Sequence, residues 1–148
     1  MEKGRKKMRE ILFRGKRIDN GEWACGFYNE FANNYTGEQE HFIQTVKQDG
    51  RIGYIRKVYP ETVGQYTGLT DKNGTRIFEG DILRRAYHPS DDLIVEWHDG
   101  SFSFRKRTLP KEYGYEALCC TQQTVSWLRV VGNIHDNPEL IGERKDNE

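Results

Sequence analysis

Short runs of apolar, β-branched and aromatic residues alternate with polar turn residues along most of this chain. Four dipeptides separate these runs at near-regular intervals, namely Asn20-Gly21, Asp49-Gly50, Asn73-Gly74 and Asp99-Gly100. Asn-Gly and Asp-Gly tolerate the positive φ of both central residues in a type I′ turn, whose twist matches that of the flanking strands. The pattern therefore predicts a mainly β chain built from hairpins, with little helix.

The clearest hairpin surrounds Asp99-Gly100. Residues 93–97 form an apolar run before the turn, and Phe102 and Phe104 alternate with Ser103 after it. Because successive side chains of a strand point to opposite faces, the two phenylalanines share one face and the serine lies on the other.

Two more hairpins are expected nearer the N-terminus, joining residues 11–18 to 23–28 and residues 41–46 to 52–55. Residues 113–128 fit one amphipathic helix or two short strands equally well. Pro138, after an asparagine and before an acidic residue, predicts a short helical turn close to the C-terminus.

Gly80 interrupts an apolar run at residues 77–83, where a glycine indicates a bulge or a sharp bend. Glu79 and Asp81 lie two positions apart, which places two carboxylates on one face of a strand, as a metal or acid–base pair requires. We favour a structural role, in which Asp81 accepts backbone N–H groups of the turn. Gly132-Asn133 is interpreted in the same way, as a corner that uses left-handed backbone conformations.

Composition limits the size and class of the fold. The 148 residues, 35% of them hydrophobic and 12% aromatic, suit one ordinary domain, or a small barrel with an extra layer, whose β-rich core uses large side chains. No apolar run approaches the roughly 20 residues of a membrane-spanning helix, so we expect a cytoplasmic protein.

The three cysteines are Cys25 and the adjacent pair Cys119-Cys120. Their number is odd and no two of them have the C-x-x-C spacing of a zinc site, so reduced, packed thiols are expected. A disulfide between the adjacent cysteines is the alternative. No metal site and no cofactor are predicted.

Two of the four histidines, His98 and His135, each precede an aspartate, which is a combination found in catalytic sites. Asp99, however, is needed in a turn, and adjacent residues of a strand face opposite sides. We therefore predict no catalytic residues. A deep pocket in which either histidine converges with Glu79 or Asp81 would support an enzyme instead.

Basic residues occur beside aromatic residues in two segments of the C-terminal half. Arginine and lysine bind phosphates, and exposed aromatic rings stack on bases, so such a mixture is a candidate surface for nucleic acid or for another partner. The formal net charge is zero, with 23 basic and 23 acidic residues, which argues against a protein that mainly binds nucleic acid non-specifically. The candidate contact residues are Arg84, Arg85, Trp97, Arg105, Lys106 and Arg107.

Three segments together resemble one known family. They are MREILFRG at residues 8–15, PETVGQYTGLTDKNG at 60–74 continuing through IFEGDI at 77–82, and VGNIHDNPEL at 131–140. With these motifs the chain resembles the YopX family of phage and prophage proteins from Met8 almost to its end.

The resemblance implies an SH3-like small barrel in the C-terminal half, preceded by an N-terminal β region, in a protein encoded by a mobile genetic element. It implies no activity and no catalytic residues. The expected divisions are a flexible leader at 1–7, a β-hairpin region at 8–59, the SH3-like barrel at 60–142 and a charged tail at 143–148. The expected structural motif residues are Gly68, Asn73, Gly74, Glu79, Gly80, Asp81, Gly132, Asn133 and Pro138.

The leading hypothesis is a phage accessory protein that acts as a non-catalytic binding module for a phage or host protein, and that forms a homo-oligomer through unpaired hairpin edges. A nucleic-acid-binding β-barrel protein is the alternative, and an enzyme is the least favoured hypothesis.

Overall fold

The computed structural model describes residues 8–86, 91–107, 115–119 and 121–142, with backbone only for 115–119. The expected leader and tail, and the side chains of the Cys119-Cys120 pair, lie outside the described residues. The described chain is mainly β, as predicted, and forms two sheets with three short helices.

The first sheet has the strand order β4-β3-β2-β1-β5-β6 and is antiparallel throughout. Its strands are β1 (Phe13–Lys16), β2 (Trp23–Ala32), β3 (Gln39–Val46), β4 (Ile52–Lys57), β5 (Gly64–Thr70) and β6 (Arg76–Phe78).

The second sheet has the order β10-β9-β8-β7-β11, with the last strand beside the first. Its strands are β7 (Asp81–Arg85), β8 (Leu93–His98), β9 (Ser101–Lys106), β10 (Tyr115–Cys119) and β11 (Leu128–Asn133). The helices are the 3-10 helix η1 (Pro60–Thr62) and the short α-helices α1 (Gln122–Val125) and α2 (Pro138–Ile141). Both sheets are open among the described residues, so closure of the expected SH3-like barrel is not confirmed.

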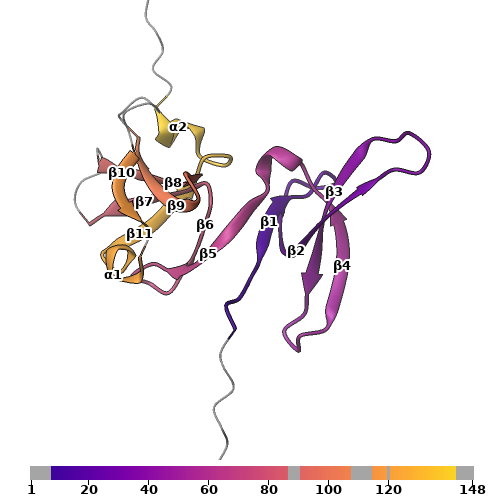
Figure 1. Cartoon of the computed structure of the whole chain (residues 1–148), viewed down its shortest axis with the longest axis horizontal. Helices are drawn as coiled ribbons and strands as arrows, with labels where there is room; N and C mark the ends of the chain where they lie inside the picture. Colours follow the sequence, from indigo (N-terminus) through magenta and orange to yellow (C-terminus); the bar gives the residue numbers. More distant parts are fainter. Residues whose placement is uncertain (1–7, 87–90, 108–114, 120, 143–148) are drawn as a thin grey trace, which may run out of the picture.

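Figure 1 shows the two sheets as neighbouring lobes, with β5 running from one to the other. β5 begins beside β1, where Gly64 lies opposite Arg14, whereas Leu69 and the buried Ile77 of β6 pack in the core of the second sheet. In the strand order, the change from the first to the second sheet falls after Phe78, because the β5–β6 hairpin hydrogen-bonds to the first sheet.

Each sheet has its own hydrophobic core. In the second sheet, Val95 and Phe104 lie opposite each other and are fully buried together with Leu83. In the first sheet, Ala24, Ile43 and Val58 form a smaller cluster on one face only. The other face of the first sheet takes no part in this cluster.

The four turn dipeptides fall at hairpin turns, as predicted, but with different backbone conformations. Asp99 and Gly100 both have positive φ, 50° and 82°, as a type I′ turn requires. At the other three turns only the glycine has positive φ among the described residues, and each turn has additional residues. The predicted type I′ conformation is therefore wrong at Asn20, Asp49 and Asn73.

The expected motif residues act mainly through local backbone geometry. Gly80 has a φ of 90° in the turn between β6 and β7, and Asp81 Oδ2 accepts the Phe78 N–H at 2.7 Å, both as predicted. Gly132 is not a left-handed corner: a Cβ there would lie 2.3 Å from Asn137 Oδ1, so close approach explains the glycine. Gly68 and Gly74 have positive φ, and Pro138 begins α2.

Candidate interaction surface

Strand pairing places a set of large apolar side chains on one face of the first sheet. Residues opposite each other in an antiparallel pair share a face, and Phe27 lies opposite Gln44, which lies opposite Ile55. Val46 lies opposite Ile52 on the same face. Alternation along β2 and β3 adds Phe31 and Phe42, whose ring centroids are 6.0 Å apart.

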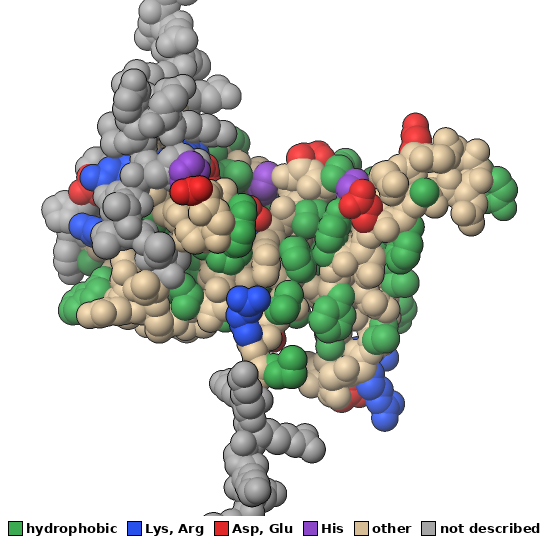
Figure 2. Space-filling view, in the orientation of Figure 1, with side chains coloured by type: hydrophobic (Ala, Val, Ile, Leu, Met, Phe, Trp, Pro, Cys, Tyr) green, Lys and Arg blue, Asp and Glu red, His purple; other side chains and the backbone are tan. Residues whose placement is uncertain are grey.

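We call these six residues the open face: Phe27, Phe31, Phe42, Val46, Ile52 and Ile55. Five of them are between 38% and 62% exposed, and Phe42 is half-buried. Figure 2 shows hydrophobic side chains gathered over the half of the molecule built from β2, β3 and β4. The small core of this sheet, around Ile43, lies on the opposite face, so the open face is not required to fill it.

The same face is covered where it continues into β1. Arg14 lies opposite Cys25 in the sheet and its guanidinium reaches Asp81 at 2.6 Å, across the boundary between the two sheets. That guanidinium also lies over the rings of Trp23 and Phe78, at 4.6 and 4.8 Å from their centroids. Arginine combines planar stacking with charge-assisted hydrogen bonding, which suits a buried joint of this kind.

Asp136 completes this joint from the loop after β11. Its carboxylate accepts hydrogen bonds from Trp23 Nε1 at 2.7 Å and from Asn133 Nδ2 at 3.0 Å, and it forms an ion pair with Lys16. Burial raises the pKa of Asp136, but the hydrogen bonds from Lys16, Asn133 and Trp23 outweigh burial and lower the pKa to about 2. We call the contacts of Arg14, Lys16, Trp23, Asp81 and Asp136 the covered end.

Both carboxylate oxygens of Asp81 already accept hydrogen bonds in this arrangement, which disfavours acid–base chemistry. Oδ1 accepts from Arg14 and Oδ2 accepts from the Phe78 N–H, while burial raises the pKa of the carboxyl group. His135 packs against the Trp23 ring, with 6.0 Å between centroids, and burial lowers its pKa. His98 lies in the second sheet, at the end of β8. These contacts favour a structural role for Asp81.

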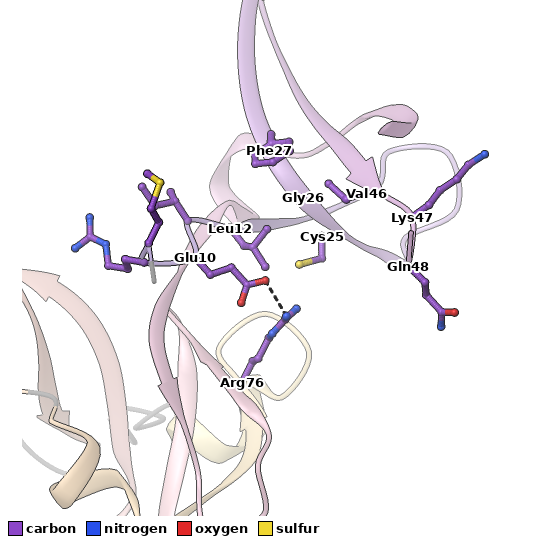
Figure 3. Close-up of a pocket in the computed structure, with 12 residues that line it drawn as sticks. Glu10, Leu12, Cys25, Gly26, Phe27, Val46, Lys47, Gln48 and Arg76 are labelled. Carbon is purple, nitrogen blue, oxygen red and sulfur yellow. Dashed lines mark hydrogen bonds and ion pairs between the residues drawn. The ribbon is translucent and has the colours of Figure 1, made fainter. Parts of the chain in front are cut away.

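A groove of about 750 Å³ lies beside the open face. Figure 3 shows Cys25 and Phe27 of β2 on one side of it and the N-terminal segment with Glu10 on the other. Glu10 forms an ion pair with Arg76 at 2.9 Å across this groove. Cys25 is a free thiol, as expected, but it is exposed and not packed in a core. The desolvation of its thiol raises the pKa, so the groove does not activate it as a nucleophile.

Three of the predicted contact arginines are already engaged within the protein. Arg84 forms two hydrogen bonds with the buried carboxylate of Asp92, at 2.9 and 2.8 Å. Arg105 is only 9% exposed and donates to Glu96 at 2.7 Å. Arg107 donates to the Leu140 carbonyl at 3.0 Å.

The other predicted contact residues do not gather into one surface. Trp97 is 55% exposed and packs edge-on against Phe102, on the face of the sheet opposite to Arg105. Arg85 lines a groove of about 310 Å³ together with Trp127, which is 76% exposed. Lys106 lies at the end of β9. The six residues are thus distributed over both faces of the second sheet.

The open face was not predicted from the sequence, although a signal for it was present. Phe27 is followed by Tyr28, which packs against the core, and Ile55 follows Tyr54, so these parts of β2 and β4 carry apolar or aromatic side chains on both faces. A strand with one face in water normally alternates apolar and polar residues. Apolar residues on both faces therefore indicate a second covering partner.

A metal site and a membrane-spanning helix are both absent from the described part of the chain. No group of three or more His, Cys, Asp or Glu side chains there could hold a metal ion. None of the described helices has the length and apolar character needed to cross a bilayer.

Comparisons with known proteins agree with this fold. Residues 12–142 match the model of a family described as "YopX protein", and this range covers most of the chain. The crystal structure of protein EF1440 from Enterococcus faecalis is similar over 91% of this chain and 100% of that chain, with 25% sequence identity and a TM-score of 0.56. No curated protein matches the chain.

Proposed function

The chain belongs to the YopX family, and from its open face we propose that it is a non-catalytic binding module that acts through protein–protein interaction. The observation that carries this proposal is the exposure of five large apolar side chains on one face of the first sheet. They lie on β2, β3 and β4, so the sheet itself fixes their positions. A rigid, preformed apolar surface loses little conformational entropy when a partner binds.

The size of the open face supports an interaction role. At exposed fractions between 38% and 62%, its side chains leave an apolar area on the order of 400 Å². The largest patch on a typical monomer covers roughly 300–600 Å² and is often functional. Aromatic residues, here Phe27, Phe31 and Phe42, are also the type enriched in the centres of protein interfaces.

The charges favour a protein partner over nucleic acid. The register also places Glu40 and Lys57 on this face, where the lysine is already paired with the glutamate at 2.9 Å. Phosphate binding depends on accessible lysine and arginine, and the six open-face residues themselves carry no charge. Among the predicted contacts, Arg84 and Arg105 already form ion pairs with Asp92 and Glu96. Nucleic-acid binding stays the alternative, with Arg85 beside the exposed Trp127 as its best remaining contact.

The resemblance to phage and prophage proteins supports the finer part of the proposal: an accessory protein of a mobile element, working in the host cytoplasm on a phage or host protein. For residues 60–142 we retain the SH3-like description. What supports it is the strand order, with β11 returning beside β7 after the short helix α1.

In-cell chemical crosslinking tests the proposed function. The full chain carries Phe27→Ser and Phe31→Ser together, and Trp127→Ser serves as a control for an even more exposed aromatic residue elsewhere. We expect discrete crosslinked adducts with the wild type and with Trp127→Ser, and their loss in the double variant. The same adducts in all three proteins would contradict a role for the open face.

A further inference from the structure

The segment between α1 and β11 holds a tryptophan that takes no part in the core. Val125 and Leu128 are 0% and 2% exposed and anchor this segment in the core of the second sheet, whereas Trp127 between them is 76% exposed. Figure 1 shows α1 in the second lobe, away from β2, β3 and β4. Tryptophan is highly buried on average, so an exposure this large points to a use outside the core.

The backbone on both sides of Trp127 is fixed by hydrogen bonds. The Gln122 side chain donates to the Thr70 carbonyl at 2.9 Å and accepts from the Thr70 N–H at 3.3 Å, which ties α1 to β5. After the tryptophan, the Leu128 carbonyl accepts the Lys72 N–H at 3.0 Å. An exposed ring on an ordered backbone is preorganised, so little conformational entropy is lost when a ligand stacks on it.

A groove of about 310 Å³ lies beside this ring and is lined by Arg85, Thr124, Trp127 and Leu128. Leu128 lies opposite Arg85 in the pairing of β11 with β7, so the two residues share a face of the sheet. Arg85 is exposed, and its guanidinium has no hydrogen-bond or ion-pair partner among the described residues. The groove therefore combines the face of an aromatic ring with an unpaired cation.

The sequence around the groove makes its charge positive. Residues 82–86 and 121–130, which supply the lining, contain three arginines and no aspartate or glutamate. Arg84 is already paired with a buried carboxylate. Arg85 and Arg129 have no ion-pair partner in the described part of the chain. A positive surface without acidic neighbours favours an anionic ligand.

The ring and the arginine together select the class of this anion. A nucleotide of a single strand offers a base that stacks on tryptophan and a phosphate that binds arginine. In a duplex the faces of the bases are covered by their neighbours, so they are not available to Trp127. The acidic side chains of a peptide would bind Arg85 but would leave the Trp127 ring without a stacking partner.

We propose that this groove binds single-stranded nucleic acid, with a base stacked on Trp127 and the adjoining phosphate bound to Arg85. The site shares no residue with the open face, so this inference goes beyond the proposed function and does not rest on it. One stacked base and one or two phosphate contacts give weak binding that tolerates different sequences, with a dissociation constant of about 100 µM at low salt.

Fluorescence anisotropy of a labelled oligo(dT) of about 12 nucleotides, titrated with the full chain at about 50 and 200 mM salt, tests this site. We expect a rise of about tenfold in the dissociation constant with Trp127→Ala, and a value within about twofold of the wild type with Trp127→Phe, which keeps an aromatic face. Arg85→Gln should make the plot of log affinity against log salt shallower by about 0.7, the value for one phosphate contact on a single strand.

Two variants serve as matched controls. Trp97→Ala changes an exposed tryptophan elsewhere on the same sheet, and Arg51→Gln changes an exposed arginine just before β4. Both should bind the oligonucleotide like the wild type. Because the Trp127 side chain is mostly exposed, Trp127→Ala should keep the wild-type unfolding midpoint, so its loss of binding reports on the groove.

Each outcome supports or overturns the proposal. Affinity that Trp127→Ala leaves unchanged, or that Trp97→Ala reduces equally, overturns this groove as the site, and tighter binding of the matching duplex overturns base stacking. If neither oligo(dT) nor oligo(U) binds at the lower salt concentration, nucleic acid is not the ligand, and a protein adduct from a photoreactive residue at position 127 would assign the groove to a protein partner. The double variant Phe27→Ser and Phe31→Ser should bind the oligonucleotide like the wild type even where its in-cell adducts are lost, so the two proposals fail separately.

Discussion

The two ends of one sheet face differ in what they contact. At the covered end, Arg14 contacts Asp81 of the second sheet and Trp23 contacts Asp136 in the loop after it. At the open end, Phe31 and Ile55 contact solvent over about half of their surface. Side chains of the same face thus stabilise the folded chain at one end and are available to a partner at the other, so substitutions at the two ends should have different consequences.

Removal of the Arg14 guanidinium is the strongest test of the covered end. Arg14→Met leaves the Asp81 carboxylate buried without its counter-ion, and the loss of one partner of a buried pair lowers the free energy of unfolding by about 3 kcal/mol. Urea unfolding measures the change. Arg17→Met removes an arginine whose partner Asp19 is 60% exposed, so no buried charge is left behind and the unfolding midpoint should stay at the wild-type value. A loss below about 1 kcal/mol for Arg14→Met would show that this joint does not hold the sheets together.

Gly132→Ala tests the close approach between β11 and the following loop. The new Cβ overlaps Asn137 Oδ1, so Asn137 must move and give up its hydrogen bond to the Asn133 N–H. We expect the free energy of unfolding, measured by thermal or urea unfolding, to fall by about 2 kcal/mol. Full stability in the alanine variant would contradict the packing explanation for this glycine.

Asp136→Asn tests the electrostatic part of the covered end. The pKa of Asp136 is about 2 in the folded chain against 3.8 ordinarily, so the carboxylate stabilises the fold above about pH 4 and this contribution disappears as the pH falls toward 2. Since about a third of the side chain is exposed, solvent screening reduces the contribution to about 1 kcal/mol. At pH 7 the free energy of unfolding of Asp136→Asn should be lower than that of the wild type by this amount. Between pH 4 and pH 2 its stability should change less with pH than that of the wild type. An unchanged profile would contradict this assignment.

Ile55→Thr tests the open end and should have the smallest effect on folding. The side chain is 55% exposed and its polar replacement suits a strand, so the free energy of unfolding should change by less than about 0.5 kcal/mol. Its association with a partner should weaken. A loss of stability comparable to that of Arg14→Met would show that the open end, too, is structural.

The hairpins were predictable because their signals are local. Asp99-Gly100 lies between alternating strands, and the predicted faces of Phe104 and Ser103 agree with the register. The covered end was not predictable, because Arg14 and Asp81 are 67 residues apart and Trp23 and Asp136 are 113 apart. Such contacts depend on how the two sheets dock.

The basic residues show a second limit of prediction from the sequence. Arg105 follows the phenylalanines in the pattern of an exposed face, yet it is buried against Glu96 of the neighbouring strand. Alternation predicts the face of a residue but not its cross-strand partner. The open face shows the opposite case, because Phe27 and Phe31 are residue types typical of a core and yet lie exposed.

The most direct test of the open face is photo-crosslinking in the cell from a single position. A photoreactive phenylalanine analogue replaces Phe31 in one protein and Trp127 in another, and the adducts are identified by mass spectrometry. We expect one dominant protein adduct from position 31 and none of comparable yield from position 127. Equal or absent adducts at the two positions would contradict the account.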